Sequence, residues 1–286
     1  MVFAVAVLVA GSGMHTAATA QAGRGGPPQR LVDPRVEQRT YQFEDTNEEL
    51  PYAVFVSSKV RPDQESPLII ALHGLGGDPN SLLRGNAIDL AEEGGYILVG
   101  PMGYNPGGWY GSPVITLGGR GGRGGTAEET PENLEELSEK DVMNVLALIR
   151  EEFNVDDGRT FLMGHSMGGG GTWHLGIKHP SLWAAIAPIS PAIYRAPTEL
   201  EKIKHIPVIV VQGAKDRLVP VDGVRKWVDK MKQLEMTHEY IEDEDGGHIF
   251  VAFENLPKIF DFFNKHRRNG AKEPSEKLLP PLEVLK

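Results

Sequence analysis

The sequence predicts an α/β fold with a mainly parallel central sheet, helices on both faces of the sheet and an antiparallel N-terminal hairpin. Two observations lead to this prediction. Short continuous apolar runs, such as residues 67–72 and 206–211, have the composition of strands that are buried on both faces. These runs alternate with segments of helical periodicity, and an alternation of strands and helices is typical of a parallel sheet.

The elements can be placed in order along the chain. Residues 39–43 and 52–57 alternate apolar and polar side chains around a polar turn near 45–47, which predicts the edge hairpin. The further strands are predicted at 67–72, 96–99, 159–163, 183–189, 206–211 and 238–241. Helices are predicted at 81–93, 138–153, directly after residue 166, at 221–234 and around 256–263. Ser138 and Asp141 predict a capping box at the start of the helix at 138–153.

Composition excludes several classes of function. The 286 residues carry a net charge of −10, which argues against nucleic acid as a partner because phosphate binding needs a basic surface. The chain contains no cysteine, so disulfides, thiolate metal sites and a cysteine nucleophile are excluded. Side chains are 40% hydrophobic, enough for a substantial core.

The ends of the chain have the composition of accessory segments. Residues 2–10 are apolar and residues 18–22 offer small side chains in A-x-A spacing, which predicts a signal peptide at 1–22, although the usual positive start is missing. The apolar run is too short to span a bilayer, so no membrane partner is expected and the protein should be secreted or periplasmic. Residues 23–34 are predicted as a linker, 35–268 as the catalytic domain and 269–286 as a mobile tail.

The motif Gly164-His165-Ser166-Met167-Gly168 lies between a β-prone run and a segment that can begin a helix. A G-x-S-x-G motif in this context is typical of a nucleophile elbow, in which the serine occupies a sharp strand-to-helix turn. The two glycines allow the strand and the helix to approach each other without a Cβ clash. Ser166 is therefore the candidate nucleophile.

A serine hydroxyl needs a base, and the base needs an acid that holds its tautomer and balances its charge. Asp216 follows the apolar run 206–211, where a carboxylate would lie at the carboxyl edge of the sheet. His248 lies in a glycine-containing loop after the last predicted strand. The order Ser, Asp, His fits the elbow. Three other carboxylates remain possible as the acid: Asp222, Asp243 and Asp245.

The other histidines are expected to have structural roles. His165 is too close in sequence to Ser166 to act as its base, and His73 is expected to shape a turn after the strand at 67–72. That turn, together with the elbow, should supply two backbone N–H groups for a developing oxyanion, from Leu75 and Met167. The acidic run 242–245 lacks the ligand spacing of a calcium loop, so no metal site is predicted.

A glycine-rich segment at 100–129 is too long for a simple connection. Its aromatic residues Tyr104, Trp109 and Tyr110 are candidates for contact with a substrate, or alternatively anchor the loop itself. Residues 118–125 alternate glycine and arginine like an RNA-binding tract, but in an acidic chain a surface loop or lid is the better interpretation.

The His73-Gly74 turn, the elbow GHSMGGGGTW, the turn GAKDRLVP and the loop GGH together resemble secreted α/β-hydrolases of the dienelactone-hydrolase, feruloyl-esterase and poly(3-hydroxybutyrate)-depolymerase group. The resemblance covers residues 66–267. The elbow is also similar to that of bacterial cutinases and polyester hydrolases, which however use a different oxyanion turn and often a disulfide.

This resemblance implies the α/β-hydrolase fold, a carboxylic-ester substrate and no cofactor. It leaves the acyl and alcohol groups of the ester open, and with them the choice between feruloyl, acyl and polyester-type substrates. Two alternatives remain: a serine peptidase of the prolyl-oligopeptidase type, for whose propeller domain the chain has no room, and a non-catalytic binding protein on the same scaffold.

Overall fold

A computed structural model describes residues 32–113, 131–193 and 195–268, and every structural statement below refers to these. They belong to a compact unit that begins at Val32. The predicted signal peptide, the Gly/Arg-rich loop at 118–125, the predicted tail and most of the predicted linker lie outside the described residues.

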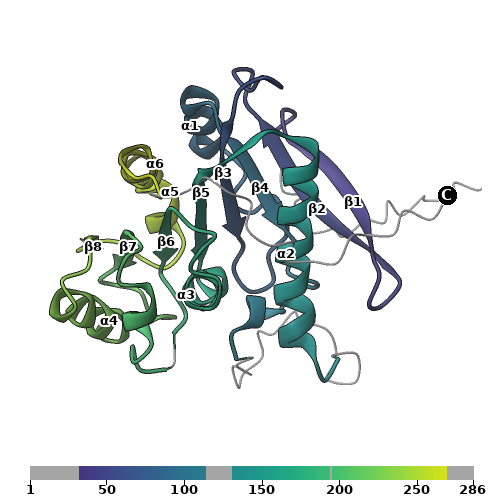
Figure 1. Ribbon diagram of the computed structural model, residues 1–286. Coiled ribbons are helices and arrows are strands. Elements are labelled where there is room, and N and C mark those ends of the chain that lie inside the picture. The colour runs from purple at the N-terminus through teal and green to yellow at the C-terminus, as the bar shows by residue number, and fades with distance from the viewer. Residues whose placement is uncertain (1–31, 114–130, 194, 269–286) are drawn as a thin grey trace, which may run out of the picture. The chain divides into compact units, whose positions relative to one another are not determined.

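An eight-stranded sheet forms the centre of this unit, in the order β1-β2-β4-β3-β5-β6-β7-β8 (Figure 1). Strand β1 pairs with β2, and β2 with β4, in antiparallel register, whereas all further pairs are parallel. The predicted sheet with its antiparallel N-terminal hairpin is therefore confirmed. The strands are β1 (Glu37–Phe43), β2 (Glu48–Val56), β3 (Ser66–Leu72), β4 (Ile97–Pro101), β5 (Val155–His165), β6 (Ala185–Ile189), β7 (Val208–Gly213) and β8 (His238–Asp243).

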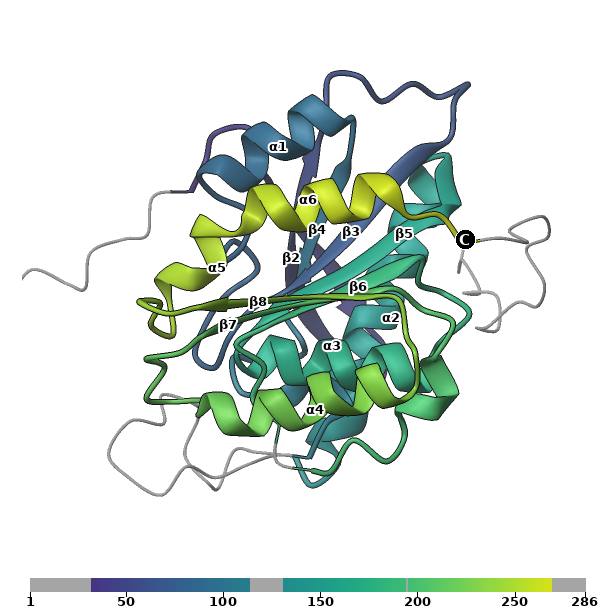
Figure 2. The same cartoon turned by 90° about the vertical axis from the view of Figure 1, so that its left-hand side faces the viewer.

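Helices cover both faces of the sheet. Figure 2 shows α1, α5 and α6 on one face and α2, α3 and α4 on the other. The helices are α1 (Asn86–Gly94), α2 (Leu134–Glu152), α3 (Met167–Lys178), α4 (Val221–Gln233), α5 (Phe250–Glu254) and α6 (Leu256–Lys265). Side chains of β3 alternate between the two cores: Leu68 and Ile70 pack in the core of α2, α3 and α4, and Ile69 packs in the other. None of these helices is long and apolar enough to cross a membrane.

Two predicted helix starts are wrong, for identifiable reasons. Helix α1 begins at Asn86 rather than near residue 81, because Gly85 adopts a left-handed backbone with φ of 59° that interrupts the helix. Helix α2 begins at Leu134, so Ser138 lies inside it and does not cap it. The Ser138 hydroxyl accepts the N–H of Tyr110 instead, at 2.9 Å. Helix α5 was not predicted from the sequence at all.

The turn between β5 and α3 depends on very close backbone packing. A Cβ at Gly168 would lie 2.2 Å from the carbonyl oxygen of Leu72 in β3, and a Cβ at Gly164 would lie 2.2 Å from the carbonyl oxygen of Gly168. Between them, Ser166 has φ of 58° and ψ of −115°, a strained conformation for a residue with a side chain. The structure therefore confirms a sharp elbow whose glycines are required by contact.

Replacing Gly168 with Ala should destabilise the protein by about 2 kcal/mol or more, because the new methyl group meets backbone atoms that cannot move independently. Gly223→Ala in α4 is the matched control, since a Cβ there has no neighbour within 4 Å. That control should be neutral or stabilising by up to about 1 kcal/mol. Urea denaturation of both variants measures the difference, and equal stabilities would contradict the packing argument.

Candidate active site

The carboxyl ends of the parallel strands bring the predicted site residues to one edge of the sheet. Ser166 follows β5, Asp216 lies in the turn after β7, and His248 lies in the loop after β8. In open α/β sheets, ligands bind outside this edge of the sheet. His248 is 82 positions from Ser166 and 32 positions from Asp216 in the chain, yet its side chain contacts both.

His248 bridges the other two residues. Its Nε2 lies 2.8 Å from the Oγ atom of Ser166, and its Nδ1 lies 2.7 Å from Oδ2 of Asp216. The His248 side chain is 11% exposed and that of Asp216 is fully covered. A carboxylate that accepts from one ring nitrogen fixes the tautomer in which the other nitrogen can accept a proton from serine.

Asp216 is held as a charged acceptor. Its Oδ1 atom accepts the backbone N–H groups of Leu218 and Val219, each at 2.8 Å. Burial acts to raise the pKa of this carboxyl group, but the hydrogen bonds from His248 and from these two N–H groups outweigh burial and lower the pKa below its usual value. Asp216 therefore stays ionised beside the imidazole at neutral pH.

The alternative acids make other contacts. Asp243 accepts the N–H groups of Asp245 and Gly246 within its own turn. Asp222 pairs with Arg225, and Asp245 pairs with Lys215. Among the four candidate carboxylates, only Asp216 has a hydrogen bond to His248 in the described part of the chain.

The turn after β3 lies directly against the nucleophile. A Cβ at Gly74 would be 3.3 Å from the Cβ of Ser166. Gly76 has φ of 72°, and its N–H binds the carbonyl group of Pro106 at 2.8 Å, which fixes the turn around Leu75. On the other side, Met167 is the first residue of α3, where backbone N–H groups have no partner within the helix. The two predicted oxyanion donors thus lie on segments that flank Ser166, and their role in binding an oxyanion stays a prediction.

His73 and Tyr110 support this turn through hydrogen bonds and ring packing. Each ring nitrogen of the buried His73 lies 2.8 Å from a backbone carbonyl oxygen, that of Gly74 or that of Met102. The hydroxyl oxygen of Tyr110 accepts the His73 N–H at 3.0 Å, and the two rings pack edge to face. Tyr110 is fully buried. Its contacts give it a supporting role for the turn.

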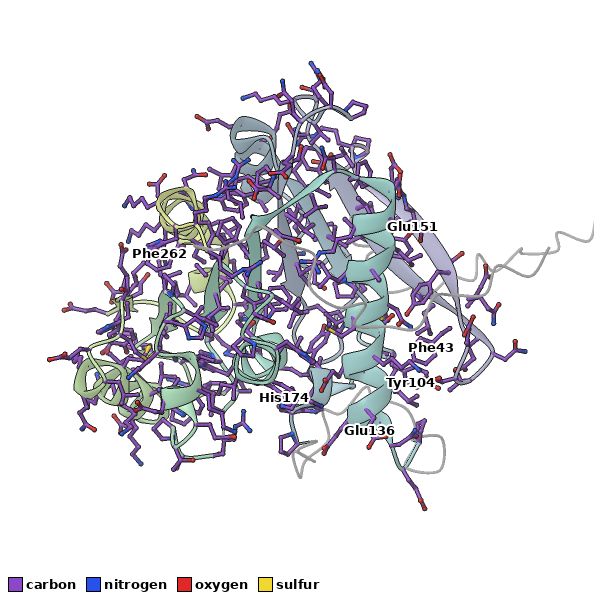
Figure 3. The ribbon with its side chains drawn as sticks, viewed as in Figure 1. Phe43, Tyr104, Glu136, Glu151, His174 and Phe262 are labelled. Carbon is purple, nitrogen blue, oxygen red and sulfur yellow. The ribbon has the colours of Figure 1, made fainter. Side chains whose placement is uncertain are left out.

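Tyr104 lies on the side of the hairpin. Its hydroxyl group donates to Glu48 at 2.7 Å, and its ring centroid lies 5.7 Å from that of Phe43 (Figure 3). The anchoring alternative therefore describes the observed contacts of Tyr104 and Tyr110 better than substrate contact does. Trp109 is buried too, at 3% exposure, and its contact with substrate stays a prediction. All three residues have positive φ, which marks the segment as strained.

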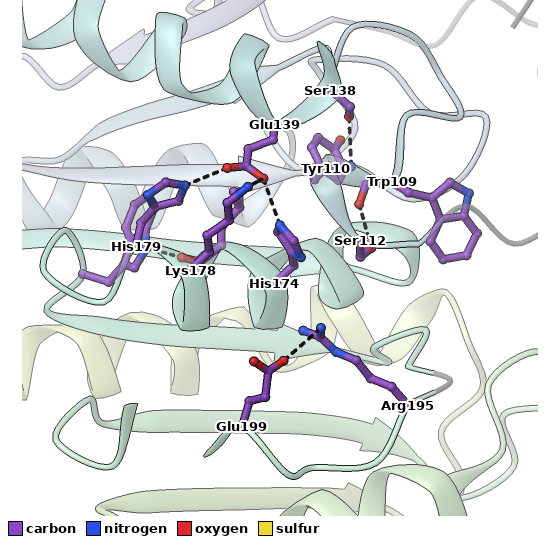
Figure 4. Close-up of polar contacts among 12 residues, drawn as sticks. Trp109, Tyr110, Ser112, Ser138, Glu139, His174, Lys178, His179, Arg195 and Glu199 are labelled. Carbon is purple, nitrogen blue, oxygen red and sulfur yellow. Dashed lines mark hydrogen bonds and ion pairs between the residues drawn. The ribbon is translucent and has the colours of Figure 1, made fainter. Parts of the chain in front are cut away.

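A cluster of polar contacts centred on Glu139 joins α2 to α3. Glu139 of α2 accepts from His174 and Lys178 of α3 and from His179, the residue directly after α3, at 2.8–2.9 Å (Figure 4). Burial acts to raise the pKa of Glu139, but these bonds outweigh burial and hold the pKa well below its usual value. In the described ranges, no group of three or more His, Cys, Asp or Glu residues is arranged to hold a metal ion.

The sequence did not indicate one contact within the site. His165 is half-buried, and its Nε2 lies 2.7 Å from the backbone carbonyl oxygen of His248, 83 residues away. Burial lowers the pKa of His165 to about 4, so its ring is neutral at neutral pH. The acceptor in this bond is a backbone atom of a distant loop, so no side-chain pattern in the sequence could have indicated it.

Several known proteins that resemble the chain are named as esterases. A family model described as PETase, PET hydrolase-like, matches residues 142–263, a range that contains Ser166, Asp216 and His248. A protein of Nocardia uniformis subsp. tsuyamanensis named as an esterase, NocK, is 26% identical over 55% of this chain and 42% of its own length. The bifunctional acetylxylan esterase/xylanase XynS20E of Neocallimastix patriciarum is 28% identical over 57% of this chain and 21% of its own length.

The matching part of the chain thus spans less than half the length of these two relatives. Among solved structures, the ferulic acid esterase AmCE1/Fae1A of Anaeromyces mucronatus superimposes with a TM-score of 0.60 at 16% identity, over 84% of this chain and 93% of the esterase. The sheet order, the elbow and these likenesses agree on one conclusion. The described residues have the α/β-hydrolase fold, and several proteins similar to the chain are named as esterases.

Proposed function

We propose that the protein is a serine carboxylic-ester hydrolase that works through an acyl-enzyme. The observation that carries this proposal is the continuous hydrogen-bond series from Ser166 Oγ through the two nitrogens of His248 to Asp216. The esterase names of the relatives support an ester as the substrate.

The first half-reaction forms the acyl-enzyme. Ser166 Oγ attacks the ester carbonyl carbon while His248 Nε2 takes its proton, and the charge that forms on the ring is balanced by Asp216. The carbonyl oxygen becomes an oxyanion, which the N–H groups of Leu75 and Met167 stabilise. When this intermediate collapses, His248 gives the proton to the leaving alcohol, and the acyl group remains on Ser166.

The second half-reaction repeats these roles with water. His248 removes a proton from water, whose oxygen attacks the acyl carbon, and the same two N–H groups stabilise the second oxyanion. Collapse then releases the carboxylic acid and returns the proton to Ser166. Atoms balance to one water consumed for each ester cleaved.

Apolar side chains around the site favour an ester with apolar groups on either side of the scissile bond. Leu75, Leu218, Ile249 and Phe250 are 38%, 67%, 54% and 73% exposed, and each belongs to or lies within two residues of a proposed site residue. Of the exposed large hydrophobic side chains in the described ranges, only Val32 lies elsewhere in the sequence. We call these four residues, Leu75, Leu218, Ile249 and Phe250, the apolar rim. The apolar rim favours feruloyl, longer acyl or polyester-type esters over small acetyl esters as substrates.

The alternatives differ in what they predict. A peptidase of the prolyl-oligopeptidase type would use the same three residues, but the names of the relatives favour esters over peptides. A non-catalytic binding protein would not turn over any ester. The proposed export through a signal peptide at 1–22 would place the substrate outside the cytoplasm.

Replacing Ser166 with Ala should reduce turnover of a p-nitrophenyl ester by about 10³-fold or more, because the nucleophile is lost while the oxyanion donors remain. Thermal unfolding should show that the variant is folded. Ser58→Ala, at an exposed serine distant in sequence from the site, is the control and should keep wild-type turnover. Wild-type-like turnover by the Ser166→Ala variant would refute the proposed function.

Replacing Phe250 with Ser should lower kcat/KM for a hexanoyl or feruloyl ester by about 5- to 10-fold, the loss expected from one apolar contact. The value for the matching acetyl ester should change less than about twofold, since an acetyl group offers little apolar surface for Phe250 to contact. Val32→Ser, at an exposed apolar position away from the site, is the matched control. Equal losses on long and short esters would contradict a substrate-binding role for the apolar rim.

A further inference from the structure

The loop that carries His248 is held by hydrogen bonds at its beginning and by the buried Val251 and Ala252 of α5 at its end. The Asp243 side chain accepts the N–H of Gly246 at 2.9 Å, and the Gly246 carbonyl oxygen accepts the N–H of Lys215 at 3.0 Å. Between Gly246 and α5, the residues on either side of His248 have few side-chain contacts. A Cβ at Gly247 would have no neighbour within 4 Å, and the next side chains after His248, those of Ile249 and Phe250, are mostly exposed.

His165 supplies a hydrogen bond to the backbone of this part of the loop. Its Nε2 donates to the His248 carbonyl oxygen at 2.7 Å, and the two imidazole centroids are 4.8 Å apart at an interplanar angle of 46°. Since a carbonyl oxygen can only accept, the proton must be on Nε2 of His165. His165 therefore has no free basic nitrogen on the side of His248, which excludes it as a second base there.

The position of His165 in the chain makes this bond more than a local contact. It precedes Ser166 directly, at the last residue of β5, which the sheet holds between β3 and β6. The bond therefore ties the backbone of the base to the strand that carries the nucleophile. The distance of 2.8 Å between Ser166 Oγ and His248 Nε2 depends on the relative position of these two backbones.

We propose that His165 is a positioning residue: its hydrogen bond to the His248 backbone sets the distance between nucleophile and base for proton transfer. This inference rests on the proposed function, because it assigns a role within the same reaction. A displacement of the base by about 1 Å is enough to lower turnover about 10²-fold in an enzyme. The Asp216 bond orients the His248 ring, whereas the His165 bond acts on the His248 backbone.

The test compares variants that differ in the N–H donor. His165→Phe keeps an aromatic ring and removes the donor, so kcat for a soluble p-nitrophenyl ester should fall about 10- to 100-fold while KM stays within about twofold. Labelling of Ser166 by a fluorophosphonate should slow by a similar factor, because that reaction reports nucleophile activation without substrate binding. His165→Asn and His165→Gln restore a side-chain N–H, and at least one of them should recover about half of the logarithmic loss in kcat.

A matched control separates positioning from general stability. His266 also binds a backbone carbonyl through a ring nitrogen, at 2.7 Å from that of Phe262, and its ring also packs on an aromatic neighbour, at 4.2 Å between centroids. His266→Phe should leave kcat and the labelling rate unchanged even if its melting temperature falls. The same melting temperature shift in His165→Phe without a fall in kcat would overturn the proposal.

The outcomes distinguish this inference from the proposed function. Turnover that survives in Ser166→Ala would refute the serine mechanism itself. Loss of turnover in Ser166→Ala together with wild-type kcat in His165→Phe would refute the positioning role alone. A fall in kcat for His165→Phe that neither amide variant recovers would also count against it, because the donor would not then be the property that matters.

Discussion

The close approach of backbone at the elbow is the constraint on which the rest of the site depends. Gly168 brings the first turn of α3 against the Leu72 carbonyl oxygen at the end of β3. Leu72 of β3 pairs with Gly164 of β5, so the strand before the nucleophile and the strand before the predicted oxyanion turn end at the same level. Ser166 then takes a strained backbone conformation that the sheet and the helix enforce from both sides. The strain is stored where the proposed chemistry occurs.

Contacts from distant segments then fix each part of the site around this elbow. Tyr110 supports the turn of His73, and Glu139 ties α3 to α2 through two histidines and a lysine. Buried polar groups of this kind are costly unless their partners are present, so each cluster favours one arrangement of its segments. The sheet brings the three proposed catalytic residues to one edge, and these contacts hold the segments next to the elbow, the turn after β3 and the helix α3.

Much of this architecture could be predicted from the sequence, because a few local patterns determine it. Continuous apolar runs identified the buried strands, since only strands covered on both faces lack polar alternation. The elbow motif and the chain order of Ser166, Asp216 and His248 placed three residues that the structure brings into contact. The start of α2 could not be predicted this way. Ser138 has the residue type of a helix cap, but its hydroxyl is used by Tyr110, whose position depends on the whole fold. The hydrogen bond of His165 could not be predicted either, because its acceptor is a backbone atom of a distant loop.

Trapping the acyl-enzyme would show directly whether Ser166 is the nucleophile. The purified protein should be mixed with an activated ester and quenched in acid within milliseconds, followed by intact mass and peptide mapping. We expect a mass increase of one acyl group, located on Ser166 and absent from a variant in which His248 is replaced by Ala. Rapid hydrolysis with no adduct on Ser166, or an acyl group located on another residue, would contradict the role of Ser166 as the nucleophile.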